Sequence, residues 1–559
     1  MEFNRFSTLL VIVVMTLSGC GGGGGSTTST DPVVLPTDID VNVTITGDYQ
    51  VESLGTANTI NANVSVGNVA KDLYLVLSNS ATTSASATIA HNAKVTEVPQ
   101  AKTVLSTDLA EKPRILHHPQ YVQNFSTRIG TVLTQDQITM SSYEKIITSI
   151  ERQEDVVGTG QRFYLSEDTS EYTDATARYV SDLIPTIFGN KKLNIWVSND
   201  SFGVGCPKTK CVTQPMVDAL AGYFLSDGLE NDIYDWVTNI YGEEWGSNLE
   251  SYFISQNNEI TILLTDIPNP SPPVYDTPDG GIIGFFYPKD NYVKGIYNNG
   301  TYDLRGSNER IMFYADAVMF ANEDGLSWDI NDSWPKEMVS TLSHEFQHMI
   351  DFYQKNVLLD VNAETWIKEM LSESTEDIIG TKIGHSVEGR YPIFNANNTL
   401  SLTEWNSQLA DYAKVNTFGA YLLRNYGGAQ VLHDIMHNSF DNEQAVVYAV
   451  NQSPNGSGKT FADLLSEWGV AVMLSDHDNL VDTPEYNIGT LFEDVYGSTI
   501  YTMNSINLFN YIPQPTLYTT SGTVQPQGNY YYKIGDNVTG DITVSLELNG
   551  QTEATLIAK

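Results

Sequence analysis

The sequence has few cysteines, few basic residues and no long hydrophobic segment, and each shortage excludes a class of protein. Only three of its 559 residues are cysteine, so the chain is not a disulfide-rich scaffold. Its 29 lysines and arginines face 68 aspartates and glutamates, for a net charge of −39. Because bound nucleic acid needs basic side chains to neutralise its phosphates, we expect no nucleic-acid partner and no basic face that docks on anionic lipid.

Hydrophobic residues make up 41% of the chain and charged residues only 17%. This composition supplies enough apolar material for large cores and excludes disorder of the whole chain. A chain of this length has room for three or four domains.

The N-terminal residues predict a lipid anchor. The apolar run at 9–15 is too short to span a bilayer, and Leu-Ser-Gly-Cys follows it at 17–20. This order resembles the bacterial lipobox, which implies a signal peptide at 1–19 and lipidation of Cys20. The alternative is an ordinary secretory signal with a chance cysteine. We expect a bacterial envelope protein that contacts the membrane only through its lipid, with Gly21 favouring the outer membrane or cell surface.

The rest of the chain divides by composition into five parts. A Gly/Ser/Thr tether covers 20–38, and alternating apolar and polar residues predict a β module at 39–95. Residues 96–160 are weakly patterned and suit a linker, an accessory region or a propeptide. The main domain is expected at 161–510, and short alternating segments at 511–559 predict terminal strands.

Within the main domain, apolar runs predict strands at 163–165, 193–197 and 260–264. We expect a helix over 171–186, helices within 214–241, and mainly helices from 335 to 475. Cys206 and Cys211 are close together in a chain expected outside the cytoplasm, so they predict a small-loop disulfide. A zinc pair is less favoured there because no histidine is nearby.

The segment His-Glu-Phe-Gln-His at 344–348 is the pattern H-E-x-x-H. Asp332 and Ser333 suit a helix cap before it, and the apolar residues around the motif recur at helical spacing. Positions four apart on a helix project from one face, so His344 and His348 can reach one metal ion. Glu345 lies beside them, where a base for an activated water belongs.

A catalytic zinc ion takes three protein ligands and water. The best third ligand is Glu369, which follows His348 by 21 residues and so fits a second, antiparallel helix. Glu373, one turn further, is placed to accept an N–H from a ligand imidazole. Three other residues compete less well for the ligand role: Glu364, Glu376 and Asp377.

This set resembles the gluzincin metallopeptidases, and the second helix matches the thermolysin-like N-E-x-x-S-D pattern at Glu369 and Ser372. A closer resemblance is to the hyicolysin family of secreted bacterial metallopeptidases. It covers roughly 161–475 and rests on 232–234, 241–246, 262–267, 280–286, 307–314 and 344–350. The resemblance implies an α+β fold of gluzincin type, with a mixed-sheet lobe and a helical lobe separated by the active-site cleft.

The expected reaction is hydrolysis of a peptide bond in a protein or peptide substrate. One Zn²⁺ per chain would activate water, and Glu345 would serve as general base. A transition-state oxyanion also needs a donor, for which Tyr412 is the first choice, since related gluzincins place a similar Tyr-to-Gly-Gly helix there. The rivals are His433, Tyr421 and Tyr426.

Several alternatives stay open. A binding or adhesive lipoprotein could keep the fold without turnover, and an aminopeptidase would need an anchor for the substrate's amine. Acidic loops such as 329–332 suit Ca²⁺, although no EF-hand pattern occurs. His437 follows His433 by four on an expected helix, which suits a metal ion, but no H-E-x-x-H pattern surrounds this pair.

Overall fold

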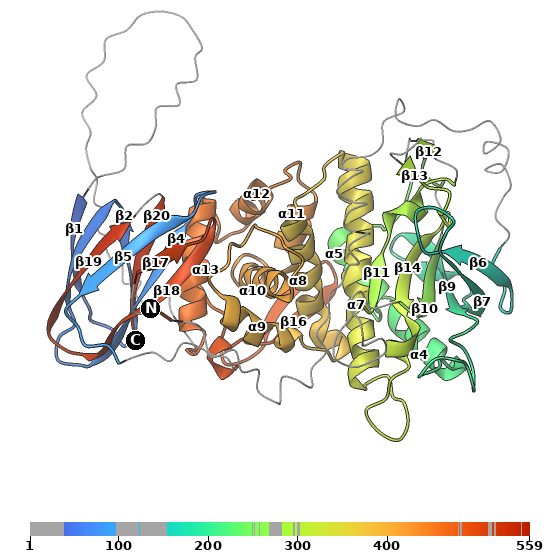
Figure 1. Ribbon diagram of the computed structural model, residues 1–559, viewed down its shortest axis with the longest axis horizontal. Coiled ribbons are helices and arrows are strands. Elements are labelled where there is room, and N and C mark those ends of the chain that lie inside the picture. Colours follow the sequence, from blue (N-terminus) through green and yellow to red (C-terminus); the bar gives the residue numbers. More distant parts are fainter. Residues whose placement is uncertain are drawn as a thin grey trace, which may run out of the picture.

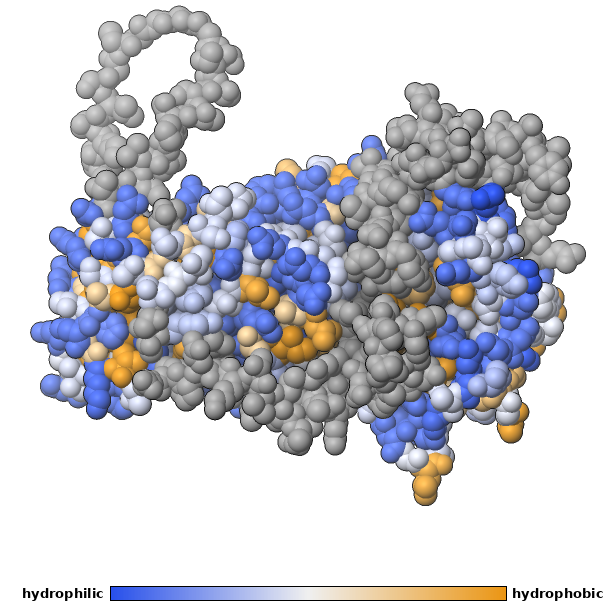
Figure 2. Space-filling model, in the orientation of Figure 1, coloured by the Kyte–Doolittle hydropathy of each residue, from blue (hydrophilic) through white to orange (hydrophobic). Residues whose placement is uncertain are grey.

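The computed structural model describes residues 38–96, 122, 154–248, 250, 252–255, 258–267, 282–294, 297–298, 302–478, 480, 483–511, 517–518, 521–548 and 551–559. Figure 1 shows an elongated molecule with a β-sandwich at one end, helices in the middle and a second sheet at the other end. Figure 2 shows one face of the molecule, on which most of the described residues are hydrophilic. In the part of the chain that is described, no helix is long and apolar enough to cross a membrane.

The β-sandwich is built from both ends of the chain. One sheet has the order β1-β3-β19-β5-β17 and the other has the order β18-β4-β20-β2. The strands are β1 (Asp38–Thr44), β2 (Gln50–Thr56), β3 (Thr59–Ser65), β4 (Lys71–Asn79), β5 (Ala85–His91), β17 (Gly522–Val524), β18 (Gly528–Val538), β19 (Asp541–Leu548) and β20 (Thr552–Ala558).

The segments 39–95 and 511–559, which we expected as separate β units, therefore share both sheets. Their alternating residues bury one apolar face each, and Ile60 and Leu75 from the first segment join Val544 and Leu556 from the second in one core. Neither segment alone has enough strands to cover that core, because each sheet places a C-terminal strand between two N-terminal ones.

The second sheet has the order β11-β14-β10-β9-β7-β6, with β8 paired to β9. Its central strands β9, β10 and β14 run parallel, and β11 pairs antiparallel with β14 at one edge. Strand β10 is buried along almost its whole length, so it is apolar without alternation. The strands are β6 (Gly160–Tyr164), β7 (Tyr172–Val180), β8 (Ile184–Thr186), β9 (Gly189–Ser198), β10 (Glu259–Thr265), β11 (Gly284–Phe286) and β14 (Ile311–Asp316).

The helix expected over 171–186 is wrong. These residues form β7 and β8, and the burial of β7 alternates around Ala175 and Ala177 as in a strand with one covered face. Pairing of β7 between β6 and β9 outweighs a weak local helical pattern, since tertiary packing decides short segments of mixed composition.

Most of the helices lie in the middle of the molecule, and α4 lies beside the second sheet (Figure 1). The helices are α4 (Gln214–Phe224), α5 (Ile233–Tyr241), α6 (Ala317–Phe320), α7 (Ser333–Asp351), α8 (Thr365–Ile383), α9 (Arg390–Asn397), α10 (Leu409–Asn425), α11 (Ala429–Met436), α12 (Gln444–Gln452) and α13 (Phe461–Leu474). Shorter elements are a π-helical turn after α7 (Phe352–Val357), the 3₁₀ turns Pro288–Asn291, Val387–Gly389 and Leu508–Asn510, and the hairpins β12 (Tyr297–Asn298) with β13 (Tyr302–Asp303) and β15 (Phe492–Tyr496) with β16 (Thr499–Met503).

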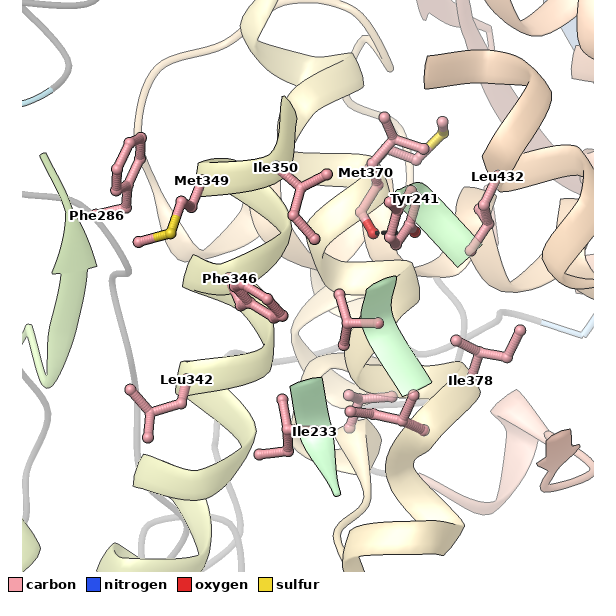
Figure 3. Packing of buried hydrophobic residues seen from close by; sticks show 14 of the residues in the cluster. Ile233, Tyr241, Phe286, Leu342, Phe346, Met349, Ile350, Met370, Ile378 and Leu432 are labelled. Carbon is pink, nitrogen blue, oxygen red and sulfur yellow. Dashed lines mark hydrogen bonds between the residues drawn. The ribbon is translucent and has the colours of Figure 1, made fainter. Parts of the chain in front are cut away.

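Helix α7 lies between the second sheet and α8. Its ring at Phe346 contacts the rings of Phe224, Tyr234 and Phe313 at centroid distances of 5.3, 5.4 and 5.9 Å. Figure 3 shows Phe346 within the hydrophobic cluster between α7, α8 and their neighbours. This packing holds α7 in place from both sides and orients the polar residues of its middle turns.

Helix α8 packs closely on α10. At Gly419 of α10 an added Cβ would lie 2.0 Å from Ser374 Oγ of α8, so only glycine permits this approach. The contact places the middle of α10 against the middle of α8. Together the sheets and helices form a mixed α+β protein.

Candidate metal centre

Three buried donors from α7 and α8 converge on one point. His344 Nε2 and His348 Nε2 lie 3.1 Å apart. Glu369 Oε2 lies 3.3 Å from the first nitrogen and 3.5 Å from the second. Ligand atoms of a tetrahedral zinc ion, each about 2.1 Å from the metal, lie about 3.4 Å from one another. The two imidazoles and the carboxylate therefore fit a zinc ion in both chemistry and spacing.

The outer nitrogen of His344 is held by Glu376. Nδ1 donates to Glu376 Oε1 at 2.8 Å, and Ser340 Oγ donates to the other oxygen of that carboxylate at 2.7 Å. A carboxylate in this position fixes the tautomer that leaves Nε2 for a metal. Burial lowers the pKa of His344, but hydrogen bonds with Glu369 and Glu376 outweigh burial and raise it to about 10.

The hydrogen bond that we expected from Glu373 to a ligand imidazole is thus made by Glu376. Because α7 and α8 run antiparallel, His344 lies one turn further along α8 than His348 does and reaches the later carboxylate. Glu373 Oε1 and Oε2 instead accept from Arg390 of α9 at 2.8 and 3.2 Å. His344, Glu373 and Glu376 also have donor atoms within 4.8 Å of one another, but the guanidinium and the Nδ1–H already bind these carboxylates.

Glu345 is completely buried and contacts the edge of the second sheet. Its Oε2 accepts the backbone N–H of Phe286 in β11 at 2.8 Å. The carboxylate follows His344 directly, yet it lies outside the three converging donors. Its hydrogen bond to a rigid strand fixes where the carboxylate points.

Tyr412, in the first turn of α10, lies against the same group of charges. Its ring is completely buried, 5.5 Å from the Arg390 guanidinium carbon and 4.9 Å from the ring of Trp405. Burial, followed by the charge of Glu369, raises the pKa of its hydroxyl well above the usual value. The hydroxyl therefore keeps its proton and can donate it in a hydrogen bond.

The other predicted oxyanion donors are bound elsewhere. Tyr421 donates to Glu467 at 3.0 Å, and Tyr426 also donates to that carboxylate. His433 Nδ1 lies 2.8 Å from the backbone oxygen of Ile240. Among the sequence candidates, the structure brings Tyr412 to the charges around Glu369 and ties these three to other partners.

The rival metal ligands also have separate partners. Glu364 accepts from the Trp366 indole at 2.6 Å, and Asp377 forms a bidentate ion pair with Arg424 at 2.6 and 3.1 Å. Asp329 of the acidic loop accepts from Asn331. None of these three acidic residues belongs to the donor groups found among the described residues.

Cys206 and Cys211 form a disulfide in the structure. The loop that it closes carries Lys208, which pairs with Asp200 and Asp266 at 3.2 and 2.5 Å. These ion pairs hold the loop to the ends of β9 and β10. The predicted signal peptide, Cys20, nearly all of the 20–38 tether and most of 96–160 lie outside the described residues.

Sequence reasoning missed Arg390 and the N–H of Phe286. Arg390 is the first residue of a short helix with no motif around it, and a backbone amide has no signature in sequence. The role of Glu376 had a signal, since it follows Glu369 by seven residues, two helical turns along the same face.

Two histidines from one helix, a glutamate from the next and a buried glutamate inside the histidine pair form an arrangement that is typical of metallopeptidase sites. The comparisons with known proteins agree. The chain belongs to the peptidase M30 family, whose model matches residues 174–476, and the predicted resemblance to the hyicolysin family is thereby confirmed.

A curated relative is the neutral metalloprotease ShpI of Staphylococcus hyicus, 24% identical over 241 residues. The match covers 40% of this chain, and the chain spans about half the length of that relative. Among solved structures, an M1 zinc metallopeptidase from Deinococcus radiodurans aligns with a TM-score of 0.28 at 10% identity, covering 77% of this chain and 65% of that one. A mutant of that enzyme has the same TM-score at 9% identity, with 78% and 67% covered. A TM-score this low does not establish a common fold.

Proposed function

We propose that this protein is a zinc-dependent endopeptidase tethered by lipid to the bacterial envelope. The observation that carries the proposal is the convergence of His344, His348 and Glu369, whose donor atoms lie 3.1 to 3.5 Å apart. Membership of the peptidase M30 family supports the same activity. When bound, zinc lowers the pKa of water toward about 7 and polarises a carbonyl.

The chain's own residues would then move the protons. Glu345, aimed by the N–H of Phe286, takes a proton from the attacking water and delivers it to the departing amine. Glu376 orients the ring of His344. The ion pair between Arg390 and Glu373 lies beside Tyr412 and fixes that side of the site. The Tyr412 hydroxyl donates to the oxygen that becomes negative in the transition state.

The substrate proposal rests on β11. This strand ends the second sheet, and its last residue already positions Glu345. An extended peptide could add to such an edge by backbone hydrogen bonds, which recognise a chain on both sides of the cleaved bond. This geometry favours an endopeptidase over an enzyme that must anchor a free amine.

The test compares wild type with Glu345→Gln, an almost isosteric change outside the metal donors. We expect one zinc per chain in both proteins by elemental analysis. Casein cleavage should fall by about 10²- to 10⁴-fold in the variant and should disappear from wild type with a chelator. Zinc in both proteins without cleavage by either would support a catalytically silent binding protein, and equal cleavage by both would refute the role of Glu345.

Anchoring through Cys20 is a separate part of the proposal. Its support is the lipobox-like order of residues and the Gly-rich tether after it. Cys20→Ser should move the protein from the membrane fraction to the soluble fraction of expressing bacteria. An unchanged membrane fraction would refute anchoring by lipid without affecting the peptidase proposal.

A further inference from the structure

His433 in α11 and His437, which directly follows the last residue of this helix, form a pair that the proposed reaction does not use. His433 and His437 stack with ring centroids 4.1 Å apart and planes inclined by 26°. They are four residues apart, so both rings leave the same face of the helix. Both side chains are partly exposed, which leaves them accessible to an ion from solution.

The backbone fixes the tautomer of both rings. His433 Nδ1 lies 2.8 Å from the backbone oxygen of Ile240, and His437 Nδ1 lies 2.9 Å from the backbone oxygen of His433. A carbonyl oxygen can only accept a hydrogen bond, so each Nδ1 must carry the hydrogen. Each Nε2 then holds a lone pair, and among the described residues neither Nε2 has a hydrogen-bond partner.

This arrangement is the one found around metal-ligating histidines, which donate their second ring N–H to a carboxylate or a backbone carbonyl. His344 shows the same logic in this chain, with Glu376 as the acceptor. At α11 two carbonyls replace the carboxylate, so two imidazoles are oriented in advance on one helical face.

The surroundings of His437 act on its pKa in both directions. Burial is the largest effect and lowers the pKa, while the backbone hydrogen bond to His433 raises it. The charges of His433 and Lys355 lower it further, and Asp434 acts in the opposite direction. The net charge of −39 attracts cations to the molecule as a whole.

We propose that His433 and His437 bind a second metal ion through their Nε2 atoms, apart from the site on α7 and α8. Two imidazoles suit a late divalent transition metal such as Zn²⁺, Cu²⁺ or Ni²⁺, and they do not suit Ca²⁺ or Mg²⁺. Water completes the coordination, because the pair belongs to no group of three donors among the described residues. The proposal does not depend on peptidase activity.

The test uses the whole purified protein with zinc already bound at the first site. Cu²⁺ is added in small excess, unbound metal is removed, and both metals are counted by elemental analysis. We expect wild type to keep its zinc and to gain one copper, whose electron paramagnetic resonance spectrum shows coupling to two imidazole nitrogens. His433→Gln and His437→Gln should each weaken copper binding by at least about tenfold, since one donor cannot chelate.

His477→Gln is the matched control, because it removes a histidine from a different surface and should leave copper binding unchanged. The proposal fails if copper enters only by displacing zinc, if a single nitrogen couples to it, or if either α11 variant binds copper as wild type does. Circular dichroism checks the folding of each variant. If a variant does not fold, the corresponding asparagine variant, His433→Asn or His437→Asn, takes its place.

Discussion

Arg390→Met offers a sharp test of how the metal site is built. The site gathers four buried carboxylates, Glu345, Glu369, Glu373 and Glu376, and Arg390 pairs with Glu373 through two hydrogen bonds of 2.8 and 3.2 Å. Methionine keeps most of the volume of the side chain but removes the charge. Glu373 then loses its bidentate partner while three other carboxylates stay near it.

Breaking a buried ion pair by removing one partner costs about 3–5 kcal/mol. We expect that loss in the metal-free protein. The loss of stability should be smaller with zinc bound, because a site with one positive charge fewer attracts Zn²⁺ more strongly. Each tenfold gain in zinc affinity raises the free energy of unfolding by about 1.4 kcal/mol. The double variant Arg390→Met/Glu373→Gln should recover much of the stability, since a neutral amide replaces the carboxylate.

Urea unfolding followed by tryptophan fluorescence, with and without a chelator, measures both effects on the same protein. The single variant Glu373→Gln completes the double-mutant cycle. The reasoning is refuted if Arg390→Met costs less than about 1 kcal/mol without metal. It is also refuted if the double variant is no more stable than Arg390→Met alone, or if zinc protects wild type and variant equally.

Three further predictions concern the ring of His344, the oxyanion and a buried acid. Glu376→Ala should weaken zinc affinity about 10- to 100-fold in a competition titration with a chromophoric chelator, and unchanged affinity would show that Glu376 does not position His344. Tyr412→Phe should lower kcat by about 10²- to 10³-fold with zinc retained, and a change in KM alone would contradict its role as a transition-state donor. Burial raises the pKa of Asp316 to about 7, against 3.8 in the unfolded chain. Unfolding therefore releases a proton between pH 4 and 7, so the contribution of Asp316 to the free energy of unfolding falls as pH rises through this range. The total fall is at most about 4 kcal/mol, and the contribution is constant above pH 7. The difference in urea midpoint between wild type and Asp316→Asn should follow that curve, and a difference that does not vary with pH would exclude Asp316 as its source.

Local patterns were enough to predict much of the metal centre. The helix that carries 344–348, the antiparallel helix that carries Glu369 and the buried strand at 260–264 all have strong periodicity or a motif. Such features depend on residues near one another in sequence, so a single chain suffices to find them.

Contacts between distant residues were not predictable in the same way. Whether Glu373 or Glu376 binds the ring of His344 depends on the position of α8 along the axis of α7. Both residues lie near the same face of α8, so the sequence does not decide between them. The pairing of Arg390 with Glu373 depends on where α9 lies after a turn. The short strands at 171–186 were misassigned because only their sheet neighbours specify them.

The β-sandwich also shows the limit of local reasoning. Alternation correctly indicated strands near both ends of the chain, but alternation does not tell one strand which other strand it pairs with. Strand β19 lies between β3 and β5, hundreds of residues away in sequence. No local signal carries that pairing.

The sandwich has a consequence for the order in which the protein is made. The residues between β5 and β17, including the whole metal centre, are inserted into a domain whose first five strands are synthesised before them. Each of its two sheets lacks an inner strand until β19 and β20 are synthesised, which happens after the metal centre. The early strands therefore keep unpaired edges while the inserted part folds. A chain truncated after α13 would contain the complete metal centre, but its β-sandwich could not close.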